Sequence, residues 1–273
     1  MARTPDGPPP APPVQRLRVR HAKRGRLRFA SHRDFQRALE RALRRANVPI
    51  AYSAGFTRHP KVSYAGAAPT GTASEAEYLE LALTERWDPD RLRAVLDAAL
   101  PPGLDVLDVV EAATPGFAER LQASVWDIAL PELPAGTVAA AAAAFLERPV
   151  IEVQRLTKNG MRTFDARAAV VRLELRPRAE PADGAGCAIL RLVVRHVMPA
   201  VRPDDVLSGL RQVADLAPPA PPVVTRLAQG LLDELTGEVA DPLAPDRCAG
   251  PATGRDAHPD QSDGTVISAS ARP

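Results

Sequence analysis

The spacing of apolar residues changes several times within the first 111 residues, and these changes constrain the fold more than any other feature. Residues 16–21 alternate the apolar Leu17 and Val19 with arginines, which is typical of a strand with one basic face. From Ser31 onward the apolar side chains instead recur every three or four positions, which predicts a helix with one apolar face. Ser31 and Asp34 are spaced as in a capping box, so we expect this helix to begin there.

The helix must end before Pro49, which cannot continue it. The pattern then predicts two strands, a helix with Pro89 in its first turn and a further strand, at residues 61–66, 77–84, 88–100 and 103–111. The resulting order, strand-helix-strand-strand-helix-strand, is that of the ferredoxin-like split motif.

The second half of the chain shows the same order as a repeat of pattern, without visible sequence identity to the first half. Its predicted strands and helices lie at residues 121–130, 135–147, 150–156, 188–196, 202–214 and 223–230, and residues 163–176 are expected to be extended or irregular. We therefore predict an α+β fold with two tandem ferredoxin-like units, at residues 15–113 and 119–235.

Both ends of the chain have the composition of disordered segments. Residues 1–14 are rich in Pro and Ala, and residues 236–273 have no periodicity and many turn-forming residues. No apolar run reaches the roughly 18 residues that a membrane helix needs. The chain has 2 cysteines, too few for a disulfide framework or an iron–sulfur cluster, and it has no glycine-rich nucleotide motif. We expect a cytoplasmic protein without a metal or cofactor.

Charge is segregated along the chain, although the net charge is only +2. Residues 16–61 hold 14 Lys and Arg against 2 acidic residues, a balance of +12, whereas residues 62–150 hold 5 basic and 14 acidic residues, a balance of −9. Concentrated positive charge attracts polyanions, because each neutralised phosphate releases condensed counterions. The sequence therefore predicts a phosphate-bearing partner, most simply RNA.

Two neighbouring segments are the candidates for this contact. The first helix carries arginines on the side opposite its apolar face, at Arg33, Arg37, Arg41, Arg44 and Arg45. Like charges at this spacing cost stability, which favours anion binding over an ordinary solvated surface. The loop after the helix adds two cations and two aromatic rings, Arg58, Lys61, Tyr52 and Phe56. The rings are expected either to stack on bases or to fill the core.

A catalytic alternative rests on His32. The positive end of the helix dipole favours a neutral imidazole there, and Ser31, Tyr52 and Lys61 are its expected neighbours. Such an imidazole is able to act as a general base in metal-free RNA cleavage, although most single histidines have no chemical role. His21 and His196 have no supporting neighbours in the sequence, and Glu77 is expected to pair with the basic loop.

The segment from residue 26 to residue 81 resembles the radical-SAM-linked (radical-SAM-associated) proteins, a domain of unknown function found alone or fused to the end of B12-binding radical SAM enzymes. The motif positions that carry the resemblance are Ser31, His32, Asp34, Arg41, Ala42, Arg44, Arg45, Ala46, Pro49, Tyr52, Ser53, Gly55, Phe56, His59, Pro60, Lys61, Gly71, Ser74 and Glu77. Arg33 and the pair Thr57-Arg58 depart from the usual pattern, and both departures add positive charge.

The resemblance implies an accessory protein that works with a radical SAM enzyme, because the chain lacks cluster-binding cysteines. Family members often lie near a ribonuclease of the E/G type in genomes, which favours RNA as the ligand. We expect a non-catalytic, substrate-binding protein that contacts RNA through its arginine-rich helix and loop. The alternatives are a metal-independent RNA endonuclease that uses His32 and a module that docks on an acidic protein surface.

Overall fold

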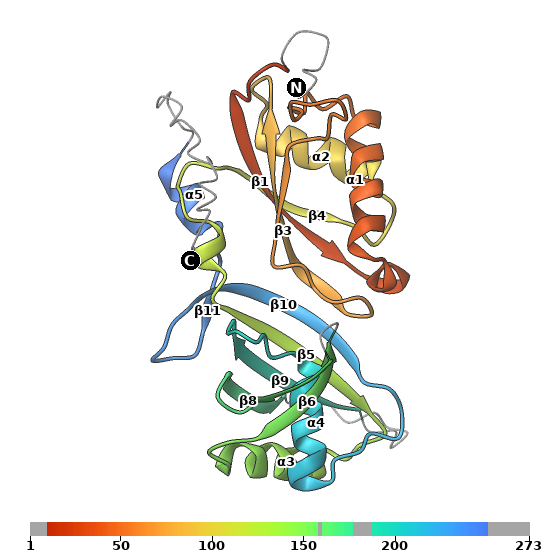
Figure 1. Ribbon diagram of the computed structural model, residues 1–273, viewed down its shortest axis with the longest axis vertical. Coiled ribbons are helices and arrows are strands. Elements are labelled where there is room, and N and C mark those ends of the chain that lie inside the picture. The colour runs from red at the N-terminus through yellow and green to blue at the C-terminus, as the bar shows by residue number, and fades with distance from the viewer. Residues whose placement is uncertain (1–9, 158–159, 177–186, 251–273) are drawn as a thin grey trace, which may run out of the picture.

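The computed structural model describes residues 10–157, 160–176 and 187–250, and it has a mixed α+β fold with five α-helices in these ranges. In the first half, the elements follow the predicted order: β1(Gln15–Lys23), α1(His32–Arg45), β2(Val62–Ala65), β3(Ala73–Leu83), α2(Pro89–Ala99) and β4(Val106–Glu111). The strands lie antiparallel in the order β4-β1-β3, with β2 beside β3. Helices α1 and α2 cover one face of this sheet (Figure 1).

Local sequence signals account for the start and the burial of α1. The Ser31 hydroxyl accepts a hydrogen bond from the backbone N–H of Asp34 at 3.2 Å, and the Asp34 carboxylate accepts one from the Ser31 N–H at 3.1 Å. The predicted capping box is therefore confirmed. Phe35, Leu39 and Leu43 are buried against the sheet, as the helical period predicted.

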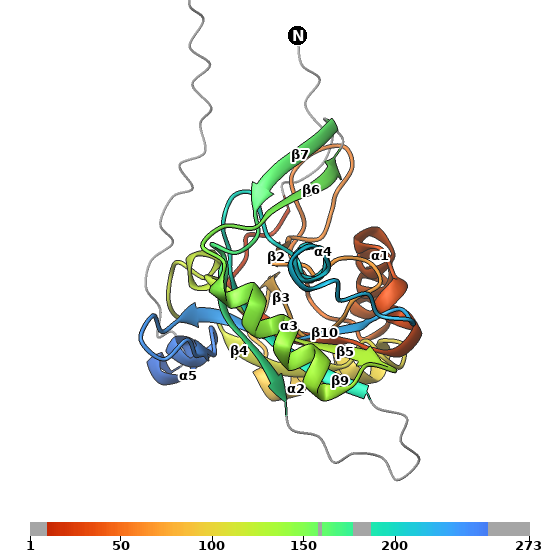
Figure 2. The ribbon, with the colours of Figure 1, turned by 90° about the horizontal axis from the view of Figure 1, so that it is seen from below.

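The second half adds further strands and two helices. Its elements are β5(Ala123–Pro131), α3(Ala135–Glu147), β6(Glu152–Thr157), β7(Gly160–Asp165), β8(Val170–Arg176), β9(Cys187–Arg195), α4(Pro203–Ala214) and β10(Val223–Leu232). Strands β10, β5, β9 and β8 are neighbours in that order, whereas β6 and β7 form a separate hairpin that projects from the body (Figure 2). The segment predicted as extended or irregular thus contains the end of β7 and all of β8.

The two halves share one sheet. Strand β10 runs parallel to β3, with Thr225 opposite Ala73 and Arg226 opposite Ser74, so that the strands of both halves join in a nine-stranded sheet. The α+β class is confirmed in this form. A short 3-10 helix, η2(Ala118–Arg120), begins at the end of the predicted link between the two units.

The chain after residue 235 differs from the expectation of disorder. Strand β11(Val239–Ala240) pairs with β10, and α5(Ala244–Ala249) lies on the opposite side of β1 from α1 (Figure 1). The buried Asp246 carboxylate accepts hydrogen bonds from Arg18 at 2.5 Å and from Arg120 at 2.9 Å. Periodicity gave no sign of this segment, because the bonds of Asp246 and the single buried Leu243 hold it, and not an apolar stripe. Residues 1–9 and 251–273 of the predicted disordered ends lie outside the described residues.

Within the ranges that the structure describes, none of the helices combines the length and the hydrophobicity that a bilayer crossing requires.

Candidate anion-binding site

The side of the sheet that faces α1 changes from apolar to polar at one end. On β1, Leu17 and Val19 are buried in the core beneath α1, and the next two residues on the same side are His21 and Lys23. His21 lies opposite Glu77 of β3. Alternation of side chains along the strand therefore places three ionisable groups at the end of the apolar core.

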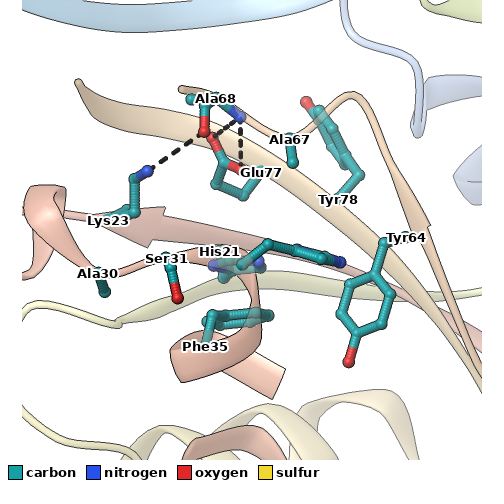
Figure 3. Close-up of a pocket in the computed structure, with 11 residues that line it drawn as sticks. His21, Lys23, Ala30, Ser31, Phe35, Tyr64, Ala67, Ala68, Glu77 and Tyr78 are labelled. Atoms are coloured by element: carbon teal, nitrogen blue, oxygen red, sulfur yellow. Dashed lines mark hydrogen bonds between the residues drawn. The ribbon is translucent and has the colours of Figure 1, made fainter. Parts of the chain in front are cut away.

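A cavity opens at this polar end, between the sheet, the start of α1 and the segment that follows β2 (Figure 3). Its volume is about 40 Å³, which corresponds to about three water molecules. This space suits a small polar group and not a nucleobase. The residues that line the cavity are His21, Lys23, Ala30, Ser31, His32, Phe35, Tyr64, Ala67, Ala68, Glu77 and Tyr78.

His21 forms part of the floor of the cavity as a neutral ring. Its imidazole stacks on Phe35, with the ring centroids 4.3 Å apart and an angle of 7° between the planes. Burial lowers the pKa of His21 to about 4, although the nearby Glu77 carboxylate acts in the opposite direction. At neutral pH the imidazole is therefore uncharged and offers an apolar face as well as ring nitrogens.

Glu77 is held in its charged form by a residue from the other half of the chain. Its carboxylate accepts hydrogen bonds from the Arg226 guanidinium at 2.5 Å and from the Ala68 N–H at 3.1 Å. Burial opposes its ionisation, but Arg226 and the Ser74 hydroxyl outweigh this effect, so the pKa of Glu77 lies below its ordinary value. The expected pairing of Glu77 with the basic loop does not form, since the carboxylate points to β10.

Lys23 is the cation of the cavity. Its side chain is buried, and its Nζ donates to the carbonyl oxygens of Ala68 at 3.4 Å and Pro69 at 3.2 Å. Among the described residues, no carboxylate lies within 4.0 Å of this Nζ. Burial lowers the pKa of Lys23, with Glu77 acting in the opposite direction.

His32 opens on this cavity, but without most of its expected neighbours. Its ring lies edge-on to Tyr64, with centroids 4.7 Å apart, and its Nε2 is 3.2 Å from the Gln36 amide nitrogen. Of the neighbours predicted for a catalytic base, Ser31 lines the cavity, whereas Tyr52 and Lys61 do not. Tyr52 instead lines a separate surface hollow beside Arg44.

The predicted arginine row is present on the solvent side of α1. Arg33, Arg37, Arg41, Arg44 and Arg45 are all exposed. The Arg45 guanidinium donates to the Ala99 carbonyl oxygen at 3.3 Å. Within the part of the chain that the structure describes, none of the five forms an ion pair.

The loop after α1 holds its two aromatic residues in different surroundings. Ser53 and His59 close the loop, since the Ser53 N–H donates to the His59 carbonyl at 2.9 Å and the His59 N–H donates to the Ser53 hydroxyl at 3.0 Å. Gly55 has a φ of 126°, which favours glycine at the turn. Tyr52 bridges to Pro60 and packs against the core, whereas Phe56 is 72% exposed.

Three other motif positions are structural. Asp34 completes the helix cap, and Ser74 is fully buried, where its hydroxyl accepts from the Arg226 Nε at 3.2 Å. Gly71 has a φ of 91°, and its N–H donates to the Arg28 carbonyl at 2.8 Å. The Gly71 bond holds the segment between β2 and β3 against the 3-10 turn η1(Gly25–Phe29) that precedes α1. Arg58 and Lys61 are exposed in the loop.

Sequence reasoning missed His21, Lys23 and Arg226. The first two were detectable, because they continue the core-facing side of β1 beyond Leu17 and Val19. Arg226 had no local signal, since its partner Glu77 lies 149 positions away. His196 also has neighbours that the sequence did not show, because its Nε2 is 2.6 Å from the Ser124 hydroxyl and its Nδ1 is 2.6 Å from the Leu121 carbonyl.

The fold and this site define an α+β domain with a cationic helix beside a small polar cavity. The sequence model of a bacterial protein family matches residues 16–203, which is more than half of the chain. The chain therefore belongs to the family described as "Uncharacterized protein conserved in bacteria (DUF2344)". The matched region contains both the arginine row and every residue that lines the cavity.

No curated protein matches the chain. Among solved structures, a candidate dyp-type peroxidase protein from Shewanella oneidensis is 7% identical over 75% of this chain and 85% of that chain, with a TM-score of 0.19. A score this low establishes neither a shared fold nor a shared activity.

Proposed function

We propose that this protein binds RNA through the exposed arginines of α1, as a non-catalytic accessory to a radical SAM enzyme. The observation that supports RNA binding is that the arginines of residues 16–61 differ in their hydrogen-bond and ion-pair partners. The arginines of β1 bond to carboxylates or backbone carbonyls, whereas those of α1 face solvent without an ion pair in the described residues.

The geometry of α1 suits a phosphate chain. Arg33, Arg37 and Arg41 are four positions apart, so successive guanidinium groups lie about 6 Å apart along the helix axis. Guanidinium groups form bidentate, charge-assisted hydrogen bonds with phosphate. A single row of such groups offers a linear track for the backbone of one strand.

Exposed aromatic rings at both ends of α1 support a nucleic-acid ligand. Phe29 precedes the helix and is 58% exposed, with the Arg28 guanidinium 4.6 Å from its ring centroid. Phe56 lies in the loop after the helix. Exposed rings beside cations are suited to stacking on unpaired bases, which favours single-stranded RNA over a duplex.

The finer fold assignment belongs to the same proposal. We infer that each half is one ferredoxin-like unit, because the strand orders β4-β1-β3-β2 and β10-β5-β9-β8 place corresponding strands alike. In this view the β6–β7 hairpin is an insertion in the second unit. The radical SAM partner is supported only by the resemblance of the motif positions between residues 26 and 81.

The test is the salt dependence of RNA binding, measured by the fluorescence anisotropy of a labelled single-stranded oligoribonucleotide. We expect affinity to fall steeply with salt, and the double variant Arg37→Ala/Arg41→Ala to lower the slope by about 1.4, since each lost phosphate contact removes about 0.7. The matched control is Arg91→Ala/Arg93→Ala, which removes two exposed arginines from α2. Equal losses in both double variants would contradict a defined binding surface.

The accessory role is tested separately, by asking whether the purified protein cleaves the RNA that it binds. We expect intact RNA after prolonged incubation without added metal. Cleavage that is lost in His32→Ala would replace the accessory role with the endonuclease alternative, which rests on the position of His32 at the cavity mouth. Binding of an acidic protein that survives nuclease treatment and needs Arg37 and Arg41 would indicate the docking alternative instead.

A further inference from the structure

The cavity beneath the start of α1 holds the Lys23 ammonium group, which has no described carboxylate within 4.0 Å, although the more distant Glu77 carboxylate acts to raise its pKa. Glu77 is the only acidic residue in its lining, and its carboxylate is bound to Arg226. Asp34, at the start of α1, is exposed and bonded to Ser31. Lys23 is therefore left with two neutral carbonyl acceptors. A buried ammonium without a counter-charge costs free energy, and a bound anion removes that cost.

We propose that this cavity binds the oxyanion head group of a small ligand, a carboxylate or a phosphate, with Lys23 as its counter-charge. This site is independent of RNA binding along α1. Its volume of about 40 Å³ limits the buried part of the ligand to the head group. The neutral His21 ring adds no second charge, and His32 stands at the same cavity as a further hydrogen-bonding side chain. Tyr64 contributes its ring, because its hydroxyl points away from Lys23 and Glu77 (Figure 3).

The apolar part of the lining favours an organic anion over a free inorganic ion. The stacked rings of His21 and Phe35 and the ring of Tyr64 line the same space as Lys23 (Figure 3). Small-molecule sites commonly combine such apolar walls with a few polar groups that fix orientation. Both a free metabolite and the phosphorylated end of a nucleic acid strand satisfy this chemistry, because the cavity mouth lies where the arginine row of α1 begins.

The first experiment measures thermal unfolding of the full chain in sodium phosphate or sodium acetate, against sodium chloride of equal ionic strength. We expect a saturable rise of Tm with phosphate or acetate that chloride does not produce. In Lys23→Met the rise should be lost, with affinity reduced at least tenfold, and the variant without ligand should be at least as stable as the parent, because its buried charge is gone. An equal rise in the parent and in Lys23→Met would overturn the proposal.

The matched control is Lys61→Met, which removes an exposed lysine outside the cavity and should keep the full response to phosphate. Because Lys61 belongs to the proposed RNA surface, this variant also separates the two proposals. If Lys61→Met weakens RNA binding and keeps the phosphate response, the two sites are separate and both proposals stand. A parent protein that binds RNA without any phosphate response refutes only the cavity site, and a phosphate response without RNA binding refutes only the RNA surface.

A second measurement needs no variant. The chain has only three lysines, at positions 23, 61 and 158, so acylation by a small amine reagent is readily assigned by peptide mass spectrometry. Phosphate should slow the labelling of Lys23 and leave that of Lys61 unchanged, whereas equal rates at Lys23 with and without phosphate would contradict the site. Protection by a terminally phosphorylated dinucleotide at lower concentration than by inorganic phosphate would identify a strand end as the source, and equal concentrations would indicate a free small anion.

Discussion

Strand β1 and helix α1 follow each other in the chain and are similarly rich in arginine, but they use it differently. Arg18 on β1 is buried between Glu80 and Asp246, and Arg16 pairs with Glu80. The arginines of α1 point into solvent and have no ion pair among the described residues. The far face of β1 is covered at Arg18 by α5, which supplies Asp246, whereas a surface helix keeps one face free. Local charge density alone therefore does not identify a binding surface.

His21 and Lys23 show two further ways in which β1 accommodates ionisable groups. His21 remains neutral through burial, and Lys23 keeps a charge beside a cavity without an acidic partner within the described ranges. Residues 16–45 thus contain ionisable groups in four different states: ion-paired, neutral, charged without a direct acidic partner, and exposed to solvent. Each has a different expected response to substitution or to pH.

The largest effect should come from removing the acid that pairs with β1. Asp246→Ala leaves Arg18 and Arg120 buried without their shared carboxylate, so we expect a loss of about 3 kcal/mol or more in the free energy of unfolding. Urea denaturation measures this loss. The control is Glu234→Ala, which breaks a more exposed pair with Arg195 and should cost less than about 1 kcal/mol. Equal stability of the two variants would show that the buried pair is not what fixes α5.

The next largest effect is the loss of stability at acidic pH that arises from His21. Because its pKa falls from 6.5 in the unfolded chain to about 4 in the folded state, only the unfolded chain takes up a proton between these values. This contribution to stability is therefore present above pH 6.5 and is lost as the pH falls towards 4. Between pH 7 and pH 5 we expect a loss of about 2 kcal/mol from this group.

The comparison is made with His21→Phe, which keeps an aromatic ring on Phe35 but does not titrate. Urea denaturation at pH 7 and pH 5 should show a smaller loss in this variant than in the parent. His59→Gln, in the exposed loop, should lose stability with pH as the parent does. Identical pH dependence in the parent and in His21→Phe would rule out a neutral buried imidazole.

The smallest effect on stability is expected from substitutions of the exposed arginines of α1. Arg41→Gln removes one charge from a row of like charges and should change the free energy of unfolding by less than about 0.5 kcal/mol, with a slight gain from reduced repulsion. The same change at Arg18 should cost about 2 kcal/mol or more, because Asp246 and Glu80 lose a buried partner. If Arg41→Gln were as destabilising as Arg18→Gln, the helix arginines would not be a free surface.

Features that depend on neighbouring residues were predictable from the sequence, and those that depend on distant ones were not. The capping box of α1, the alanine-rich α3 and the order of strands and helices in the first half follow from local spacing. The parallel contact between β3 and β10 has no local signature, and without it neither the joined sheet nor the partner of Glu77 is deducible. The polar end of β1 was predictable only in part. The alternation of its side chains was visible in the sequence, whereas the cavity that they line was not.

The bond between Glu77 and Arg226 has a consequence for the way this protein is divided. Every residue that lines the cavity lies before residue 79, so a fragment ending at residue 113 would contain the whole lining. Such a fragment would nevertheless lack Arg226, which neutralises Glu77 from β10. Glu77 would then be free to pair with Lys23 and to quench the charge that an anion would meet. The second half of the chain therefore keeps the Glu77 carboxylate bound to Arg226 and away from Lys23. Splitting the protein for crystallography or for a two-hybrid screen would change the charge of the cavity, although every residue of its lining would still be present.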